Sequence, residues 1–107
     1  DQHYIDLLSN HSFHFIPVVN MDGLNYITDN FFITGEYAIK RKNMNTSYGG
    51  QWLCENYNQG GDLNRNYGVS WGQNDLSSKV CSEQFAGPRA FSEPESRAVR
   101  DFIIKES

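Results

Sequence analysis

The segment from Gly60 to Gly72 constrains this 107-residue chain more than any other part of it. It reads Gly-Gly-Asp-Leu-Asn-Arg-Asn-Tyr-Gly-Val-Ser-Trp-Gly, so four glycines surround a cluster of polar residues. Glycine adopts backbone conformations with positive φ and lets the chain pass close to another group. Polar side chains in such a frame are typical of a binding loop rather than of a hydrophobic core.

Asn64 and Arg65 are the candidate ligand-binding residues of this segment. The guanidinium of Arg65 offers a planar fork of donors that matches a carboxylate or a phosphate, and the amide of Asn64 can donate to the same anion. An isolated Asn-Arg pair more often has a structural role, in which the arginine pairs with an aspartate and the asparagine closes a turn. This pair of residues alone leaves both interpretations open.

Composition and charge limit the classes of protein to consider. The net charge of -4 and the pI near 5.2 provide no basic face for nucleic acid. No apolar run approaches the roughly 18 residues of a membrane span, and the first residues do not have the pattern of a signal peptide. Aromatic residues make up 14% of the chain, which indicates a folded protein rather than a disordered one.

The two cysteines, Cys54 and Cys81, bracket the glycine-rich segment. From two cysteines alone, a disulfide and a pair of reduced, buried thiols are equally compatible with the sequence. Two N-glycosylation sequons, Asn10-His11-Ser12 and Asn45-Thr46-Ser47, fit a secretory route, although this pattern is common by chance.

Residue patterns predict several elements along the chain. Residues 1–9 have helical spacing of apolar side chains, and residues 12–19 are typical of a buried strand. Residues 20–23 carry turn chemistry, so we expect a loop at the end of that strand facing the site. Residues 31–33 are compatible with another short strand, and the basic run at 40–42 with a solvated face.

In the last part of the chain, the residue patterns predict a long loop and, further on, a helix. Residues 45–61 have little periodicity and predict a long loop fastened by Cys54. Ser92 with Glu95 forms a capping-box pattern, Pro94 suits a first helical turn, and amphipathic spacing predicts a helix from about 93 to 105 that packs on a sheet.

Five segments in order along the chain also carry recognisable motifs. They are Pro17-Val18-Val19-Asn20-Met21-Asp22-Gly23, Arg41-Lys42, Asp62-Leu63-Asn64-Arg65-Asn66-Tyr67-Gly68, Cys81-Ser82-Glu83 with Gly87-Pro88, and Ala90-Phe91-Ser92-Glu93-Pro94-Glu95. Together they resemble the zinc metallocarboxypeptidases of the carboxypeptidase A/B type. Met21 and Lys40 depart from the pattern, since the family usually has Pro and Trp there.

The resemblance implies a fold and an activity. The fold would be α/β, a mixed twisted sheet flanked by helices in an α/β/α arrangement, with residues 1–107 as the central portion of a single catalytic domain. The activity would be zinc-dependent hydrolysis of the C-terminal bond of peptides and proteins. The zinc ligands and the general base would lie outside this chain, so the isolated chain would be inactive. The oligomeric state is left open.

The resemblance also assigns roles to individual residues. Asn64 and Arg65 would clamp the substrate carboxylate, Arg41 would stabilise the oxyanion, and Asp62 would orient a zinc-binding histidine. The family's disulfide beside this loop implies a Cys54–Cys81 bridge. It also implies a secreted, extracellular or lysosomal-type compartment.

Two other functions remain to be weighed. One is a catalytically inactive carboxypeptidase-like protein that keeps the clamp as a binding or structural module. The other is a carbohydrate-binding domain whose aromatic residues stack on sugars, namely Tyr48, Trp52, Tyr57 and Tyr67. The second alternative explains the aromatic residues but not the Asn64-Arg65 pair.

Overall fold

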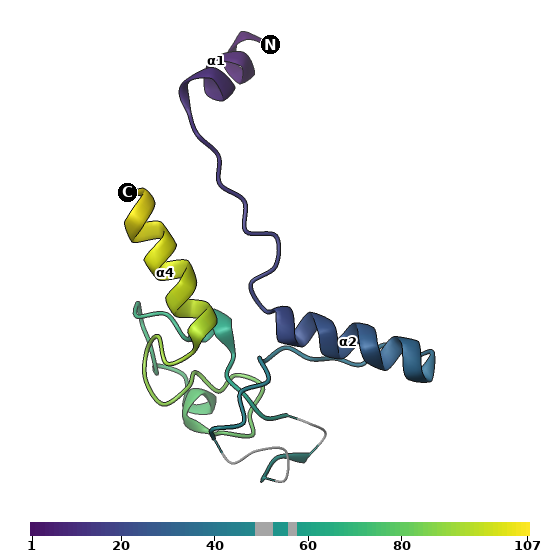
Figure 1. The fold of residues 1–107 in the computed structure, drawn as a ribbon. Coiled ribbons are helices and arrows are strands. Elements are labelled where there is room, and N and C mark those ends of the chain that lie inside the picture. Colours follow the sequence, from purple (N-terminus) through teal and green to yellow (C-terminus); the bar gives the residue numbers. More distant parts are fainter. Residues whose placement is uncertain (49–52, 56–57) are drawn as a thin grey trace.

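The computed structural model describes residues 1–48, 53–55 and 58–107 (Figure 1). This part of the chain contains the α-helices α1 (Gln2–Asn10), α2 (Met21–Thr34) and α4 (Pro94–Glu106). Two short 3₁₀ helices, η2 (Leu63–Arg65) and η3 (Asp75–Ser78), lie in the loop-rich region between α2 and α4.

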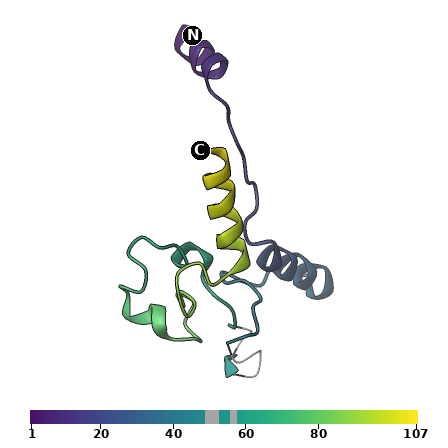
Figure 2. The same cartoon turned by 60° about the vertical axis from the view of Figure 1, so that its left-hand side comes forward.

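The molecule is extended rather than compact. Its radius of gyration is 17.2 Å, whereas a compact chain of this length has about 13 Å. Both views show α1 standing away from the other elements, at the end of an extended segment (Figures 1 and 2). Hydrogen bonds from Asn43 and Asn66 join the loop-rich region to the start of α4.

Residues 12–19 do not form the predicted buried strand. They are extended and exposed except for the half-buried Val19, and no residue that the structure describes lies in a β-strand. A strand needs a neighbour for its backbone hydrogen bonds, and the described residues provide none. The mixed sheet expected from the resemblance is therefore not confirmed, and α4 does not pack on a described strand.

The prediction of a turn at residues 20–23 and a strand at 31–33 is wrong, because both lie in or beside α2. Asn20 caps this helix through its Oδ1, which accepts from the Gly23 backbone N–H at 3.0 Å. The helix ends at Gly35, whose φ of 76° is the usual left-handed helix terminus. Caps at both ends outweigh the strand preference of the aromatic and branched residues between them.

The predicted C-terminal helix is confirmed as α4, but its predicted capping box is wrong. Glu93 is the N-cap residue, and its side chain makes no capping hydrogen bond. Ser92 Oγ donates instead to Glu93 Oε2 at 2.8 Å, and the Glu95 carboxylate accepts from Asn43 Nδ2 at 3.1 Å. The Ser92 and Glu95 side chains bond to other side chains, so they do not accept hydrogen bonds from the backbone N–H groups at the start of the helix.

Polar residues dominate the buried interior of the described part of the chain. Its buried hydrophobic residues are Cys54, Leu63, Phe85 and Ala86. The buried polar and charged residues are Lys40, Lys42, Asn43, Gln59, Asp62, Asn66, Ser77, Glu93 and Ser96. Because a buried polar group is costly unless it is hydrogen-bonded, this interior depends on specific hydrogen bonds.

Cys54 and Cys81 form a disulfide, which confirms the pairing that the resemblance implied. Their Cα atoms are 5.2 Å apart, and the bridge closes a loop that contains η2 and η3. Of the aromatic residues considered for sugar stacking, Trp52 and Tyr57 lie outside the described residues. Tyr48 and Tyr67 each pack edge-on against a phenylalanine, with centroid distances of 5.4 and 5.7 Å, which is ordinary local packing.

Candidate functional site

The segment singled out from the sequence forms η2 and its flanks. Asp62 caps this short helix, because its Oδ1 accepts from the Asn64 backbone N–H at 3.2 Å. The backbone N–H groups of Arg65 and Asn66 donate to the carbonyls of Asp62 and Leu63 at 3.0 and 3.1 Å. The tight turn points the Leu63 side chain inward, leaves Asn64 exposed and half-buries Arg65.

Asp62 contacts both arginines that the sequence analysis singled out. Arg41 donates to Asp62 Oδ2 through Nε at 2.9 Å and through Nη2 at 2.8 Å. The Nε of Arg65 lies 3.5 Å from the same oxygen, within ion-pair distance but without a hydrogen bond. The Asp62 side chain is 2% exposed, whereas those of Arg41 and Arg65 are 42% and 38% exposed. One buried carboxylate thus anchors two half-exposed cations.

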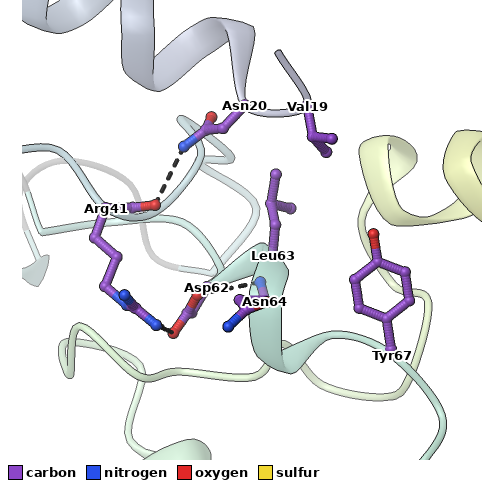
Figure 3. Close-up of a pocket in the computed structure, with 7 residues that line it drawn as sticks. All are labelled: Val19, Asn20, Arg41, Asp62, Leu63, Asn64 and Tyr67. Atoms are coloured by element: carbon purple, nitrogen blue, oxygen red, sulfur yellow. Dashed lines mark hydrogen bonds and ion pairs between the residues drawn. The ribbon is translucent and has the colours of Figure 1, made fainter. Parts of the chain in front are cut away.

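A cavity of about 310 Å³ lies beside the Arg41–Asp62 pair (Figure 3). Its lining residues are Val19, Asn20, Arg41, Asp62, Leu63, Asn64 and Tyr67. Val19, from the extended segment before α2, and Leu63 of η2 contribute apolar side chains to it. Asn64 and Arg41, whose guanidinium is directed at Asp62, contribute polar ones. Asn20 Nδ2 donates to the backbone carbonyls of Arg41 and Lys42 at 3.2 and 3.1 Å, which ties the start of α2 to this cavity.

Arg65 is placed differently from the other predicted site residues. It borders a second cavity of about 190 Å³ together with Asn64 and the loop that follows η2. Asn64 lines both cavities, whereas Arg41 and Asp62 line the first. The structure therefore brings Arg41, Asp62 and Asn64 to one cavity, whereas Arg65 lines the second cavity, which Asn64 also lines.

The glycines before η2 allow the backbone to pack closely against other residues of this chain, and not against a ligand. Gly60 has a φ of 94°, and a Cβ there would lie 2.1 Å from the backbone oxygen of Asn43. A Cβ on Gly61 would meet the Glu93 side chain at 3.2 Å. These glycines serve the internal packing of the loop, which a ligand-directed interpretation of the motif did not anticipate.

The interpretation of residues 40–42 as a solvated basic run is wrong for two of the three. Lys40 and Lys42 are buried, and only Arg41 is exposed. Lys40 Nζ donates to the carbonyl of Gln59 at 2.7 Å. Lys42 Nζ donates at 2.8 and 2.9 Å to two carbonyls of the loop 80–82. Lysines on either side of Arg41 thus anchor its backbone while its side chain faces the cavity.

Burial of these two lysines lowers the pKa of each. Burial, followed by the charge of Lys40, lowers the pKa of Lys42 to about 8, while Glu83 and Asp62 act in the opposite direction. Burial likewise lowers the pKa of Lys40, opposed by Glu83. Removing an ammonium group from water disfavours its charged form, which explains both directions.

Three buried polar residues next to the site were missed by the sequence analysis. Asn43 and Asn66 are 1% and 0% exposed, and Glu93, at the predicted start of the C-terminal helix, is 0% exposed. Asn43 and Asn66 lie beside residues that were recognised, Lys42 and Arg65. Sequence alone does not separate a buried asparagine that makes tertiary hydrogen bonds from a turn residue, because both occur in glycine-rich loops.

The described residues do not provide a metal site. No group of three or more His, Cys, Asp or Glu side chains among them is placed to hold a metal ion. The donor set of the described residues therefore does not fit a zinc site. In the same described residues, no helix is both long enough and apolar enough to cross a membrane.

Comparison with known proteins identifies the class of protein. The family model described as zinc carboxypeptidase matches residues 1–107. Carboxypeptidase B of Astacus astacus is 37% identical over 95% of this chain and 30% of its own length. Carboxypeptidase B of Bos taurus is 38% identical over 94% of this chain and 21% of its own length.

A solved structure agrees with these relatives. The crystal structure of carboxypeptidase A from Helicoverpa armigera superposes with a TM-score of 0.61 at 43% identity, covering 84% of this chain and 19% of that one. This chain belongs to the zinc carboxypeptidase family. It spans from about a fifth to a third of the length of the relatives that it matches.

Proposed function

We propose that the full-length protein is a zinc-dependent carboxypeptidase, and that residues 1–107 are the central portion of its single catalytic domain. Its substrates are the C-termini of peptides and proteins. Family membership supports this function. The observation that carries it is the cavity of about 310 Å³, which is lined by the polar residues Arg41 and Asn64 and by apolar side chains. A C-terminal residue presents the matching groups, an anionic carboxylate and a side chain.

Recognition of a free C-terminus depends on the carboxylate clamp. An internal peptide bond has no such anion, so a guanidinium and an amide that bind a carboxylate distinguish a chain end. In this proposal the Arg65 side chain turns from the second cavity toward Asn64 when substrate binds. The contact that it would release, the ion pair with Asp62, is long at 3.5 Å, and partial exposure of Arg65 weakens it further.

Arg41 acts on the reacting carbonyl in this proposal. A cation held beside the scissile bond stabilises the negative charge that develops on the carbonyl oxygen. Asp62 fixes the Arg41 guanidinium through two of its nitrogens, which reduces the reorganisation needed when that charge appears. One zinc ion, held by residues outside this chain, would supply carbonyl polarisation and water activation in the intact domain.

The test is substitution of Arg65 by Ala in the full-length protein. The substrates are an N-acylated dipeptide with a free C-terminal carboxylate and the same dipeptide as its C-terminal amide. Loss of a charge-assisted pair costs about 2–5 kcal/mol, so kcat/KM for the free acid should fall by roughly 30-fold to several thousand-fold. The amide, which lacks the anion, should lose far less.

Arg89→Ala is the matched control, because Arg89 is an exposed arginine outside both cavities. It should leave the selectivity for the free acid unchanged. Equal losses for acid and amide in Arg65→Ala would assign that residue a structural role. Tight binding of the free acid without hydrolysis by the wild-type protein would instead favour the catalytically inactive binding module.

The disulfide supports an oxidising compartment. Disulfides persist in secreted, extracellular and lysosomal-type environments and are rare in reducing ones. The Cys54–Cys81 bridge therefore favours a secreted, extracellular or lysosomal-type location for the full-length protein. Recovery of the protein in the culture medium of secreting cells, with this bridge intact, is the expected result.

A further inference from the structure

The segment 61–66, which carries Asp62, Asn64 and Arg65 and is called here the clamp segment, is held at both ends by buried asparagines. At its start, the Asn43 backbone N–H donates to the Gly61 carbonyl at 3.0 Å, and Asn43 Oδ1 accepts from the Gly61 N–H at 2.9 Å. Both backbone polar groups of Gly61, its N–H and its carbonyl, are thus hydrogen-bonded to Asn43. Its position is set by the side chain and backbone of one buried residue.

At its other end, Asn66 joins the clamp segment to the start of α4. Asn66 Oδ1 accepts from the Glu93 backbone N–H at 3.1 Å and from Ser96 Oγ at 2.5 Å. Its Nδ2 donates to the Ala86 carbonyl at 2.7 Å and to Ser92 Oγ at 2.8 Å. Asn66 is fully buried, so these bonds are shielded from competition by water.

Glu93 connects the two ends. Its Oε1 accepts from Asn43 Nδ2 at 2.9 Å, while its own backbone N–H donates to Asn66. Its carboxylate also accepts from Asn45 Nδ2 at 3.0 Å and from the Tyr48 hydroxyl. The N-cap residue of α4 therefore holds the entry and the exit of the clamp segment, consistent with the position of η2 beside the start of α4 in Figure 1.

The protonation of Glu93 is compatible with this arrangement. Burial by itself raises the pKa of this carboxyl group. The hydrogen bonds donated by its neighbours, Tyr48, Asn43, Ser92 and Asn45, outweigh burial and hold the pKa below its ordinary value. Glu93 is therefore a charged acceptor with four donors converging on it at neutral pH.

We propose that Glu93 is a positioning residue for substrate recognition: through Asn43 and Asn66 it fixes both ends of the clamp segment and thereby the placement of Asn64 and Arg65. This inference rests on the carboxylate-clamp role proposed above. Glu93 itself does not line either cavity, so it acts through the backbone of the clamp segment. Small displacements of binding groups reduce rates strongly, which makes such a support measurable.

The experiment compares Glu93→Gln with Glu95→Gln in the full-length protein. Glutamine keeps the size of Glu93 but replaces one acceptor oxygen with a donor, so the four converging donors lose part of their acceptor. Glu95 is the matched control, since it lies in the same helical turn and also accepts from Asn43 Nδ2, but is half-buried and does not contact Asn66.

The readout is the ratio of kcat/KM for the free-acid dipeptide to that for its C-terminal amide. Glu93→Gln should lower this ratio by roughly 10- to 100-fold, mainly through KM for the acid. Glu95→Gln should leave it unchanged. A purely structural role for Glu93 would reduce the amount of active enzyme and lower both rates equally, so an unchanged ratio with reduced total activity overturns the proposal.

A milder variant keeps the test decisive if Glu93→Gln does not fold. Tyr48→Phe removes one donor to Glu93 and retains the ring that packs edge-on against Phe85. It should lower the same ratio in the same direction, and no change in the ratio overturns the proposal. Arg65→Ala separates the carboxylate-clamp role from the positioning role of Glu93. If Arg65→Ala lowers the ratio and the Glu93 and Tyr48 variants do not, the clamp role is retained and the positioning role is rejected.

Discussion

The guanidinium of Arg41 and the carboxylate of Asp62 form a pair in which two donor nitrogens meet one oxygen, at 2.8 and 2.9 Å. These residues are 21 positions apart in the sequence, and Asp62 is buried while Arg41 is exposed. The family resemblance gave Asp62 a different task, orientation of a zinc-binding histidine. The pair with Arg41 gives it a second one within this chain.

We predict that Arg41→Ala in the full-length protein lowers kcat with little change in KM. The oxyanion exists only along the reaction coordinate, so its stabilisation does not contribute to ground-state binding. Removal of one such stabilising group typically costs about 10²–10³-fold in kcat. Steady-state kinetics with the free-acid dipeptide measures both parameters. A rise in KM with unchanged kcat would instead make Arg41 a ground-state binding residue.

Asp62→Asn should act partly through Arg41. We predict that its effect on kcat is smaller in an Arg41→Ala background than in the wild type, with a coupling energy of about 0.5–3 kcal/mol. Zinc content of each variant, measured by atomic absorption, separates this coupling from a role in metal binding. Additive effects of the two substitutions would show that the pair does not contribute to catalysis.

The disulfide should contribute to stability as a loop closure. In the chain-entropy model, a bridge over a loop of this length contributes roughly 3.5 kcal/mol. We predict that the Cys54→Ser/Cys81→Ser variant has a correspondingly lower free energy of unfolding in urea. A reductant should destabilise the wild type to the same level, and the double variant should be insensitive to it. Equal sensitivity of both proteins would contradict this assignment.

Lys42 should make stability rise as the solution becomes alkaline. Its folded-state pKa of about 8 lies below its ordinary value of 10.5, so between these pH values the unfolded chain binds more protons than the folded one. The stability of the wild type relative to Lys42→Met should therefore increase as pH rises through this window. Urea unfolding of both proteins at about pH 7 and about pH 9.5 measures the difference. A constant or decreasing difference in stability would show that folding does not lower the pKa of Lys42.

Of the two sequons, only the one at Asn10 should carry a glycan. Asn10 is exposed at the end of α1, whereas Asn45 Nδ2 donates to the buried Glu93 at 3.0 Å, so a sugar on that nitrogen would disrupt the contact. In protein secreted from eukaryotic cells, peptide mass spectrometry should find a glycan on Asn10 and none on Asn45. Asn45→Gln should leave the glycan on Asn10 intact. A glycan found on Asn45, or on neither residue, contradicts this prediction.

Local sequence signals predicted the helices at the two ends of the chain, because spacing of apolar residues and a proline in the first turn act over a few positions. Residues 20–23 and 31–33 were misassigned, the latter because the aromatic pair near the end of α2 favours a strand by propensity alone. The cap at Asn20 decided for a helix, and its side chain also bonds to the backbone of Arg41 and Lys42. Those contacts are 21 and 22 positions away in sequence, beyond any local pattern.

The sequence by itself determined the family, because motifs in fixed order carry that information, and the family resemblance in turn implied the disulfide and the candidate site residues. Only the tertiary structure showed that Asp62 pairs with Arg41, that Arg65 borders a separate cavity, and that Asn43, Asn66 and Glu93 support the clamp segment. The physical reason is burial: whether a polar side chain is solvated or bonded to a distant partner depends on what the fold places beside it.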